Sequence, residues 1–395
     1  MRSPPLVLLV ACLSLLPSNP FLLHPPKHHP APLRGWVKGE VGGWTWDDAV
    51  DTPPPPDIPR SSSSLQPPKL PPGSFRPKQS LGQNFLTDQN TINNIVSAFA
   101  KDASLPSASS SSPPPKMVEL GPGPGALTNV LVARYGAPAL TCVEIDPRAV
   151  SILRASFPGL SVRHADVLRV EYPLLNAALA GEQPLAVIGN LPYYITSQIL
   201  FALADASHAD AVRCATVTMQ REVGDRLVAG TSTKDYGILS VVFQLYADVR
   251  MHFRIPNTVF YPKPKVESAL MGLKFVGAKE LRRRLRGARP KDLQRVVKAC
   301  FGQRRKVIRN TLKGMMRGEF GEGEVTEKIG ALGELGAKRP EELGWREFVE
   351  VTRGIYGVEE GWEDGYELGD KVWRKEKHGG GFGEEEEAAE AVAQD

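Results

Sequence analysis

The sequence predicts a doubly wound, mainly parallel α/β fold followed by a small all-helical domain. Two observations predict the sheet. From Met117 onward, short apolar runs alternate with segments of helical periodicity, and a glycine-rich loop separates the first run from the first helix. This alternation is typical of parallel sheets that are covered by helices on both faces. The third observation predicts the helical domain: beyond Gly277 the chain is strongly basic and shows no strand pattern.

The elements of the sheet follow in chain order. Strands are expected at 117–120, 140–145, 160–163, 185–188 and 212–219, and helices at 126–135 and 147–157. We divide the chain into a leader and linker (1–72), the sheet domain (73–276), the helical domain (277–357) and a Gly-rich, acidic tail (358–395). From Gly379 the tail is Gly-rich and then acidic, and this part is expected to be a solvated, disordered end.

Composition excludes several classes of protein. The 395 residues are 42% hydrophobic and 23% charged, as in ordinary globular proteins. The net charge of +4 permits a nucleic-acid partner without requiring one. The four cysteines are far apart, so we expect neither a metal site nor a disulfide framework. No apolar stretch reaches the length of about eighteen residues that a membrane span needs.

The first 72 residues are predicted to be a targeting leader. An apolar run at 6–16 has the length of a signal-peptide core, and a segment rich in Pro, Ser, His and Lys follows at 17–32. This arrangement resembles the bipartite leaders of proteins imported into plastids of secondary origin. The alternatives are a mitochondrial leader, for which the run is too apolar and Arg too scarce, and a plain disordered extension. The three tryptophans within 35–50 have no physical explanation at this level.

The first motif with chemical meaning is Gly-Pro-Gly-Pro-Gly-Ala at 121–126, between the first predicted strand and helix. Glycine lets the backbone approach a ligand, and a helix start offers unpaired N–H groups. Glu144 ends the second predicted strand about twenty residues later, where an acid binds ribose hydroxyls in nucleotide-binding folds. The pattern predicts a nucleoside cofactor. It leaves a nicotinamide dinucleotide, S-adenosylmethionine and a mere tight turn open.

The second motif is Asn190-Leu-Pro-Tyr193, at the carboxyl end of the fourth predicted strand, where ligands bind in such sheets. An adenine amino group is a poor nucleophile because its lone pair is delocalised into the ring. The Asn190 side-chain carbonyl and a backbone carbonyl held open by Pro192 can accept both amino hydrogens. Tyr193 offers a face for stacking, worth about 1–3 kcal/mol. The motif therefore favours methyl transfer by positioning; the alternative is an Asn-Pro turn beside a core aromatic residue.

Several motifs occur in one order: Gln83-Asn-Phe-Leu86, the glycine loop, Glu144-Ile-Asp146, Asp166, Asn-Leu-Pro-Tyr, and Phe260-Tyr-Pro-Lys-Pro-Lys-Val-Glu-Ser268. Together they resemble the ribosomal RNA adenine N6-methyltransferase family, which dimethylates two adjacent adenosines near the 3′ end of small-subunit ribosomal RNA. The resemblance covers residues 75–356 and implies a Rossmann-like class I methyltransferase sheet with a small all-helical C-terminal domain. With the leader, it indicates an organellar, plastid member. The Ser/Pro-rich insertion at 104–116 and the acidic tail depart from the family pattern.

The resemblance also implies residue roles. The cofactor would be S-adenosylmethionine, bound by Asn84, Leu86, Gly121, Glu144, Asp166 and Asn190. Asn84 and Leu86 would belong to an N-terminal segment that closes over it, with Gly121 at the methionine end, Glu144 at the ribose and Asp166 at the adenine. Catalysis would rest on Asn190, Pro192, Tyr193 and Phe260. We expect Tyr193 and Phe260 to sandwich the target adenine; the alternative places Phe260 in the junction between the domains.

A basic run extends from Lys279 to Arg317. It holds fifteen Lys or Arg residues against Glu280 and Asp292. A solvated helical face is the usual interpretation of such a run, but so large a local excess favours binding of RNA phosphates. The residues predicted to do so are Arg304, Arg305, Lys306 and Arg309, within a stretch at 301–310 that resembles the family's basic helix.

We therefore predict a monomeric RNA adenine dimethyltransferase that acts on small-subunit ribosomal RNA or a pre-ribosomal particle. One alternative is an organellar transcription factor of the same fold, with or without methyl transfer. Another is a nicotinamide oxidoreductase, which only the glycine loop favours.

Overall fold

The computed structural model describes residues 76–106, 114–179, 183–358 and 372–373, together with two short strands, β1 (Trp36–Lys38) and β2 (Trp44–Trp46). Its contacts divide the chain into residues 1–57 and 58–395. In the first unit, β1 and β2 pair antiparallel with Trp36 opposite Trp46, so the tryptophan-containing segment forms a hairpin. The rest of the predicted leader lies outside the described residues. All further elements belong to the second unit.

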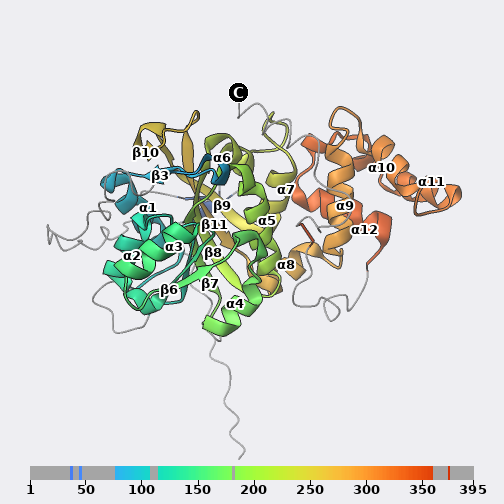
Figure 1. The fold of residues 1–395 in the computed structure, drawn as a ribbon. Helices are drawn as coiled ribbons and strands as arrows, with labels where there is room; N and C mark the ends of the chain where they lie inside the picture. The colour runs from blue at the N-terminus through green and yellow to red at the C-terminus, as the bar shows by residue number, and fades with distance from the viewer. Residues whose placement is uncertain are drawn as a thin grey trace, which may run out of the picture. The chain divides into compact units, whose positions relative to one another are not determined.

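Seven strands of the second unit form one sheet in the order β6-β5-β4-β7-β8-β11-β9 (Figure 1). They are β4 (Met117–Leu120), β5 (Leu140–Glu144), β6 (Ser161–His164), β7 (Leu185–Asn190), β8 (Val212–Gln220), β9 (Ala247–Ile255) and β11 (Ser268–Phe275). The strands β4 to β8 are parallel, and β11 is antiparallel to both of its neighbours. The predicted fold class is confirmed, and β9 and β11 are additions that the sequence analysis did not assign.

Helices cover both faces of this sheet. One face carries α1 (Gln89–Asp102), α2 (Ala126–Tyr135) and α3 (Pro147–Ser156); the other carries α4 (Tyr172–Leu179), α5 (Thr196–Ser207), α6 (Arg221–Val228) and α7 (Ile238–Tyr246). The side chains of β4 alternate between them, with Met117 in the core under α1 and α2 and Val118 and Leu120 in the core on the opposite side. Burial on both faces explains why the inner parallel strands β4, β5, β7 and β8 are mainly apolar, whereas the edge strand β6 is polar and mostly exposed.

The basic stretch beyond Gly277 is helical, as predicted. It forms α8 (Gly277–Leu285), α9 (Pro290–Phe301), α10 (Ile308–Met316), α11 (Glu322–Ala331) and α12 (Trp345–Tyr356). Short 3-10 helices lie at Gln79–Leu81, Ala137–Ala139, Val167–Arg169, Tyr193–Ile195, Asn257–Val259, Leu335–Ala337 and Pro340–Glu342. The helical part shares one continuous core with the sheet, because Phe243 of α7 and Val296 of α9 belong to the same buried cluster. None of the described helices is long and apolar enough to span a membrane.

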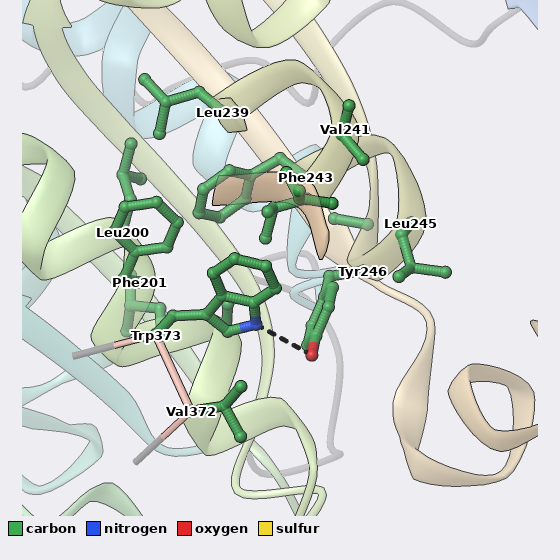
Figure 2. Close-up of a cluster of buried hydrophobic side chains, with 14 of the residues drawn as sticks. Leu200, Phe201, Leu239, Val241, Phe243, Leu245, Tyr246, Val372 and Trp373 are labelled. Carbon is green, nitrogen blue, oxygen red and sulfur yellow. Dashed lines mark hydrogen bonds between the residues drawn. The ribbon is translucent and has the colours of Figure 1, made fainter. Parts of the chain in front are cut away.

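Part of the segment between α12 and the Gly-rich end of the chain is buried. Trp373 is only 1% exposed, and its ring stacks on Phe201 of α5 with the centroids 5.7 Å apart (Figure 2). Its indole nitrogen donates to the Tyr246 hydroxyl at 3.0 Å, and its backbone N–H donates to the Asp205 carboxylate at 3.1 Å. The solvated end is predicted from Gly379 onward, and those residues lie outside the described part of the chain, as do residues 359–371 and 374–378.

A two-stranded ribbon is present in addition to the seven-stranded sheet and is separate from it. β3 (Phe85–Leu86) pairs antiparallel with β10 (Phe260–Tyr261), with Leu86 opposite Phe260 and Phe85 opposite Tyr261. The ribbon joins the segment before α1 to the segment that leads into β11.

Candidate active site

A cavity of about 220 Å³ opens at the carboxyl edge of the parallel strands. Its lining comes from residues 81–85, 120–121, 123, 143–145, 166–168, 190–195 and 199. Parallel strands direct their carboxyl ends to one edge of a sheet, which is where ligands bind in open α/β folds. The cavity therefore collects most of the predicted site residues: Asn84, Gly121, Glu144, Asp166, Asn190, Pro192 and Tyr193.

The glycine loop between β4 and α2 forms the floor of this cavity. Gly121 and Gly123 have φ values of 63° and 55°, in the left-handed region that side chains other than glycine rarely adopt. A Cβ atom on Gly123 would lie 2.7 Å from the Phe85 ring, which itself lines the cavity. Glycine at this position thus lets the N-terminal segment close against the loop.

Glu144 holds its carboxylate against the same loop. One oxygen accepts from the backbone N–H of Gly123 at 2.9 Å, and the other accepts from the N–H groups of Ile145 at 2.9 Å and Asp146 at 2.8 Å. Burial raises the pKa of Glu144, although these three donors oppose the rise. The acid is thus fixed in one orientation at the cavity wall, as binding of a ribose diol requires.

Asp166, at the end of the segment that follows β6, lines the opposite part of the cavity. One of its oxygens accepts from the Leu168 N–H at 2.9 Å, which orients the carboxylate. Glu144 ends β5 and Asp166 follows the neighbouring strand β6, so two carboxylates line the same cavity. No group of three His, Cys, Asp or Glu side chains within the described residues is arranged to bind a metal.

Asn190 ends β7 with its amide oriented. Its side-chain Nδ2 donates to the backbone carbonyl of Asn84 at 2.6 Å, which leaves Oδ1 as the acceptor for a ligand. Tyr193, three residues later, shares a hydrogen bond of 2.6 Å between its hydroxyl and Ser268 Oγ. Burial raises the pKa of Tyr193, so its hydroxyl stays protonated at neutral pH. The amide and the aromatic ring are thus both held in place.

Two predicted site residues lie elsewhere. Leu86 and Phe260 are 5% and 4% exposed, and both belong to the core under α1 and α2, so neither lines the cavity. Successive residues of a strand point to opposite sides. The residue of β3 that reaches the cavity is therefore Phe85, and the exposed residue of β10 is Tyr261, at 62%. The predicted sandwich of Tyr193 and Phe260 around an adenine is not formed in this structure.

Asp146 is a site residue for which sequence reasoning proposed no role. It is fully buried and accepts from Gln83 Nε2 at 3.0 Å and from Arg148 at 2.6 Å. Arg148 also donates to the carbonyl of Arg76 at 3.1 Å. The hydrogen bond from Arg148 holds the pKa of Asp146 down at about 2. Asp146 thus ties the N-terminal segment to the start of α3, a link that no spacing rule indicates between residues so far apart.

Glu119 lies behind the glycine loop on β4 and is 1% exposed. Its carboxylate accepts from Thr128 Oγ1 of α2 at 2.7 Å. Burial raises the pKa of Glu119 to about 7. This acid braces the strand against the helix that opens after the loop.

The predicted phosphate-binding residues divide into two kinds. Arg304 pairs with Glu341 at 2.6 Å and donates to the carbonyls of Thr233 at 2.8 Å and Lys234 at 2.7 Å. Its guanidinium therefore joins the helical part to the loop before α7, and these contacts compete with the predicted contact to RNA. Arg305, Lys306 and Arg309 are exposed and make no ion pair within the described part of the chain. Other cations of the run pair with acids: Arg283, Arg284, Arg286, Arg289, Arg295 and Arg317.

Comparison with known proteins agrees with this geometry. Residues 74–346 match the family model for ribosomal RNA adenine dimethylase. A ribosomal RNA small subunit methyltransferase A from Salinibacter ruber is 41% identical over 288 residues, which cover 71% of this chain and 86% of the relative. The protein of the same name from Porphyromonas gingivalis is 36% identical over 275 residues, which cover 70% of this chain and 96% of that relative.

Among solved structures, a dimethyladenosine transferase from Plasmodium falciparum superposes with a TM-score of 0.55 at 18% identity. The match covers 69% of this chain and 98% of that structure, and it shows a shared fold. The family model spans more than half of the chain, and the relatives are matched over most of their length. The chain therefore belongs to the ribosomal RNA adenine dimethylase family.

Proposed function

We propose that this protein transfers methyl groups from S-adenosylmethionine to the N6 amino groups of two adjacent adenosines near the 3′ end of small-subunit ribosomal RNA, during ribosome maturation. The observation that carries the proposal is the orientation of Asn190. Its Nδ2 is committed to the Asn84 carbonyl, so its Oδ1 is the atom available to an adenine amino group. Membership of the ribosomal RNA adenine dimethylase family supports the same activity.

The residues present fit S-adenosylmethionine. Glu144 would hold the ribose hydroxyls, Asp166 the adenine amino group, and the loop at Gly121 the methionine end, because all three lie on one cavity. The left-handed backbone at Gly121 allows the close approach that this requires. When bound, the cofactor supplies an electrophilic methyl group.

The protein's own residues would act by positioning. Asn190 Oδ1 accepts one amino hydrogen of the target adenine, which localises the nitrogen lone pair and directs it into the cavity. Tyr193 supplies a stacking face whose direction is fixed by the bond between its hydroxyl and Ser268. An oriented pair of reactants can account for a large part of a rate enhancement, about 7–11 kcal/mol in favourable intramolecular cases.

The RNA would be held by phosphate contacts from the helical part. Arg305, Lys306 and Arg309 are exposed at the turn into α10 and its first residues. Each phosphate contact displaces condensed counterions, so binding through these side chains depends on salt concentration.

A direct assay tests the proposal. Purified protein is incubated with labelled S-adenosylmethionine and with small ribosomal subunits, or their RNA, from cells lacking the modification, and nucleosides are identified by mass spectrometry. We expect dimethyladenosine at two adjacent positions, and none with Asn190→Ala. Wild-type protein that binds the cofactor but leaves both substrates unmethylated would contradict the proposal.

We further propose a plastid destination, with the mitochondrion as the alternative, and a monomeric enzyme. The composition of residues 1–72 supports the first. A fluorescent fusion of residues 1–72 should enter plastids; signal in the cytosol would refute the destination. Sedimentation of the purified protein should give the mass of one chain, and a dimer mass would refute the monomer.

A further inference from the structure

The segment 261–267, here called the rim loop, presents an aromatic ring and two amines to solvent beside the cavity. Tyr261 is 62% exposed and Val266 is 43% exposed. Lys263 and Lys265 are also exposed, and neither has a partner within the residues that the structure describes. Aromatic residues are enriched at binding surfaces relative to the rest of a protein's surface, and unpaired amines suit an anionic ligand, so this combination points to a binding surface.

One end of the rim loop is joined to the segment that covers the cavity. Tyr261 is the antiparallel partner of Phe85, whose ring lines the cavity and contacts the glycine loop. Just beyond this ribbon, the backbone N–H of Thr87 donates to the Val259 carbonyl at 2.9 Å. Tyr261 therefore keeps a fixed place at the edge of the cavity.

The other end is joined to the Asn-Leu-Pro-Tyr motif. Ser268, the first residue after the rim loop, shares its hydrogen bond with the Tyr193 hydroxyl. Glu267 pairs with Arg221 at 2.8 Å, and its carbonyl accepts from the Arg221 N–H at 3.0 Å. In the middle, Asn257 Nδ2 donates to the Pro264 carbonyl at 3.2 Å. The rim loop is thus braced at both ends and at its centre.

We propose that the rim loop is a binding subsite for the RNA strand next to the target adenine. Tyr261 stacks on the base that flanks the target, and Lys263 and Lys265 contact the adjoining phosphates. This rests on the proposed function. An adenine withdrawn into the cavity leaves its neighbour with one unstacked face, and an exposed aromatic ring replaces the lost contact. Because Phe260 is buried, Tyr261 is the residue of β10 that can meet the RNA.

The full-length protein carrying Tyr261→Ala tests the stacking contact. We expect KM for small-subunit RNA to rise about tenfold, as loss of one stacked base implies, with kcat and cofactor affinity unchanged. Tyr261→Phe keeps the stacking face and should restore KM to within about twofold. Leu174→Ala is the matched control, because Leu174 is 68% exposed on α4, away from the ribbon (Figure 1).

The double substitution Lys263→Ala, Lys265→Ala tests the phosphate contacts. Each phosphate contact to a single strand contributes about 0.7 to the slope of log affinity against log salt concentration. Loss of two contacts should therefore reduce the magnitude of this slope by about 1.4. Lys101→Ala, an exposed lysine on α1, should leave the slope unchanged. An unchanged KM in Tyr261→Ala, or an unchanged slope in the double variant, would overturn the subsite.

Failure of the subsite can be told apart from failure of the proposed function. If wild-type protein methylates the RNA and Tyr261→Ala does so with the same KM, only the subsite is wrong. If the wild type methylates nothing, the proposed function fails, and equal binding of a fluorescent small-subunit RNA fragment by wild type and Tyr261→Ala would then overturn the subsite as well.

Discussion

Asn190 Nδ2 donates to the backbone carbonyl of Asn84 across 2.6 Å, although 106 residues separate the two in sequence. The bond joins the end of β7 to the N-terminal segment over the cavity. It also decides which atom of the amide is left to face a substrate. Catalytic orientation therefore depends on a contact with the main chain of a distant segment.

Asn190→Asp tests this relationship. A carboxylate cannot donate, so two oxygens would face each other at a distance that now holds a hydrogen bond, and the side chain would turn away. We expect the single-turnover rate of methyl transfer to fall about 100-fold or more, as a misplacement of about 1 Å in an active site does. Quench-flow measurement with saturating cofactor gives this rate. A normal rate would show that the Asn84 contact does not orient the amide.

Glu144→Ala should weaken S-adenosylmethionine binding tenfold or more, since hydrogen bonds to a charged group contribute about 1.5–3 kcal/mol. Titration calorimetry measures the affinity directly. Glu144→Gln keeps one acceptor oxygen and the shape of the side chain, so its affinity for S-adenosylmethionine should fall less than that of Glu144→Ala. Equal affinity in wild type and Glu144→Ala would remove this acid from the cofactor site.

Arg304 and its neighbours should respond differently to removal. Arg304→Ala breaks the link to Glu341 and to the loop before α7, so it should lower the melting temperature. The triple substitution Arg305→Ala, Lys306→Ala, Arg309→Ala should leave the melting temperature unchanged and flatten the salt dependence of RNA binding. Calorimetric melting and fluorescence binding at several salt concentrations separate the two effects. A stable Arg304→Ala variant with a flattened salt dependence would return Arg304 to the RNA-binding surface.

Glu119 should make stability depend on pH. Its folded pKa of about 7 lies above the ordinary value of 4.5, so the unfolded chain loses the proton first. The free energy of unfolding therefore falls as pH rises from about 4.5 to 7 and levels off above. The side chain of the Glu119→Gln variant cannot ionise. Between pH 4 and pH 8 the free energy of unfolding of this variant should therefore fall by about 3 kcal/mol less than that of wild type. Urea unfolding at each pH gives both curves, and parallel curves would contradict the assignment.

Sequence patterns located the parallel part of the sheet closely. β4 and α2 occupy the predicted residues, because a buried apolar run and a helix meet at an unmistakable glycine loop. β9 escaped assignment because it is an edge strand whose side chains are mostly half-buried, so it shows no apolar pattern. The ribbon of β3 and β10 is too short for any periodicity to register.

The candidate site shows the same division. Glu144 and Asn190 were predictable because each lies at the carboxyl end of a parallel strand, and such ends meet at one edge. Asp166 was implied only by the resemblance to the family. The burial of Phe260 and Leu86 could not be predicted from the sequence, because it depends on the pairing of these two residues across the ribbon. Charge alone could not separate Arg304 from Arg305, since the difference is a pairing with Glu341. Trp373 lies beyond the matched family residues, in a segment to which the sequence analysis assigned no element.

The ribbon of β3 and β10 has a thermodynamic consequence. One of its strands belongs to the segment that lines the cavity and the other begins the rim loop, so a ligand that orders either strand pre-organises its partner. Such coupling is reciprocal: the factor by which cofactor tightens RNA binding must equal the factor by which RNA tightens cofactor binding, typically about 5- to 150-fold. The test measures the affinity for RNA with and without S-adenosylhomocysteine, and the affinity for S-adenosylhomocysteine with and without RNA. The two ratios should be equal. If both ratios are one, the two strands act independently. If the two ligands are coupled in this way, a shortage of methyl donor also weakens RNA binding. An enzyme without bound cofactor would then not occupy its RNA substrate.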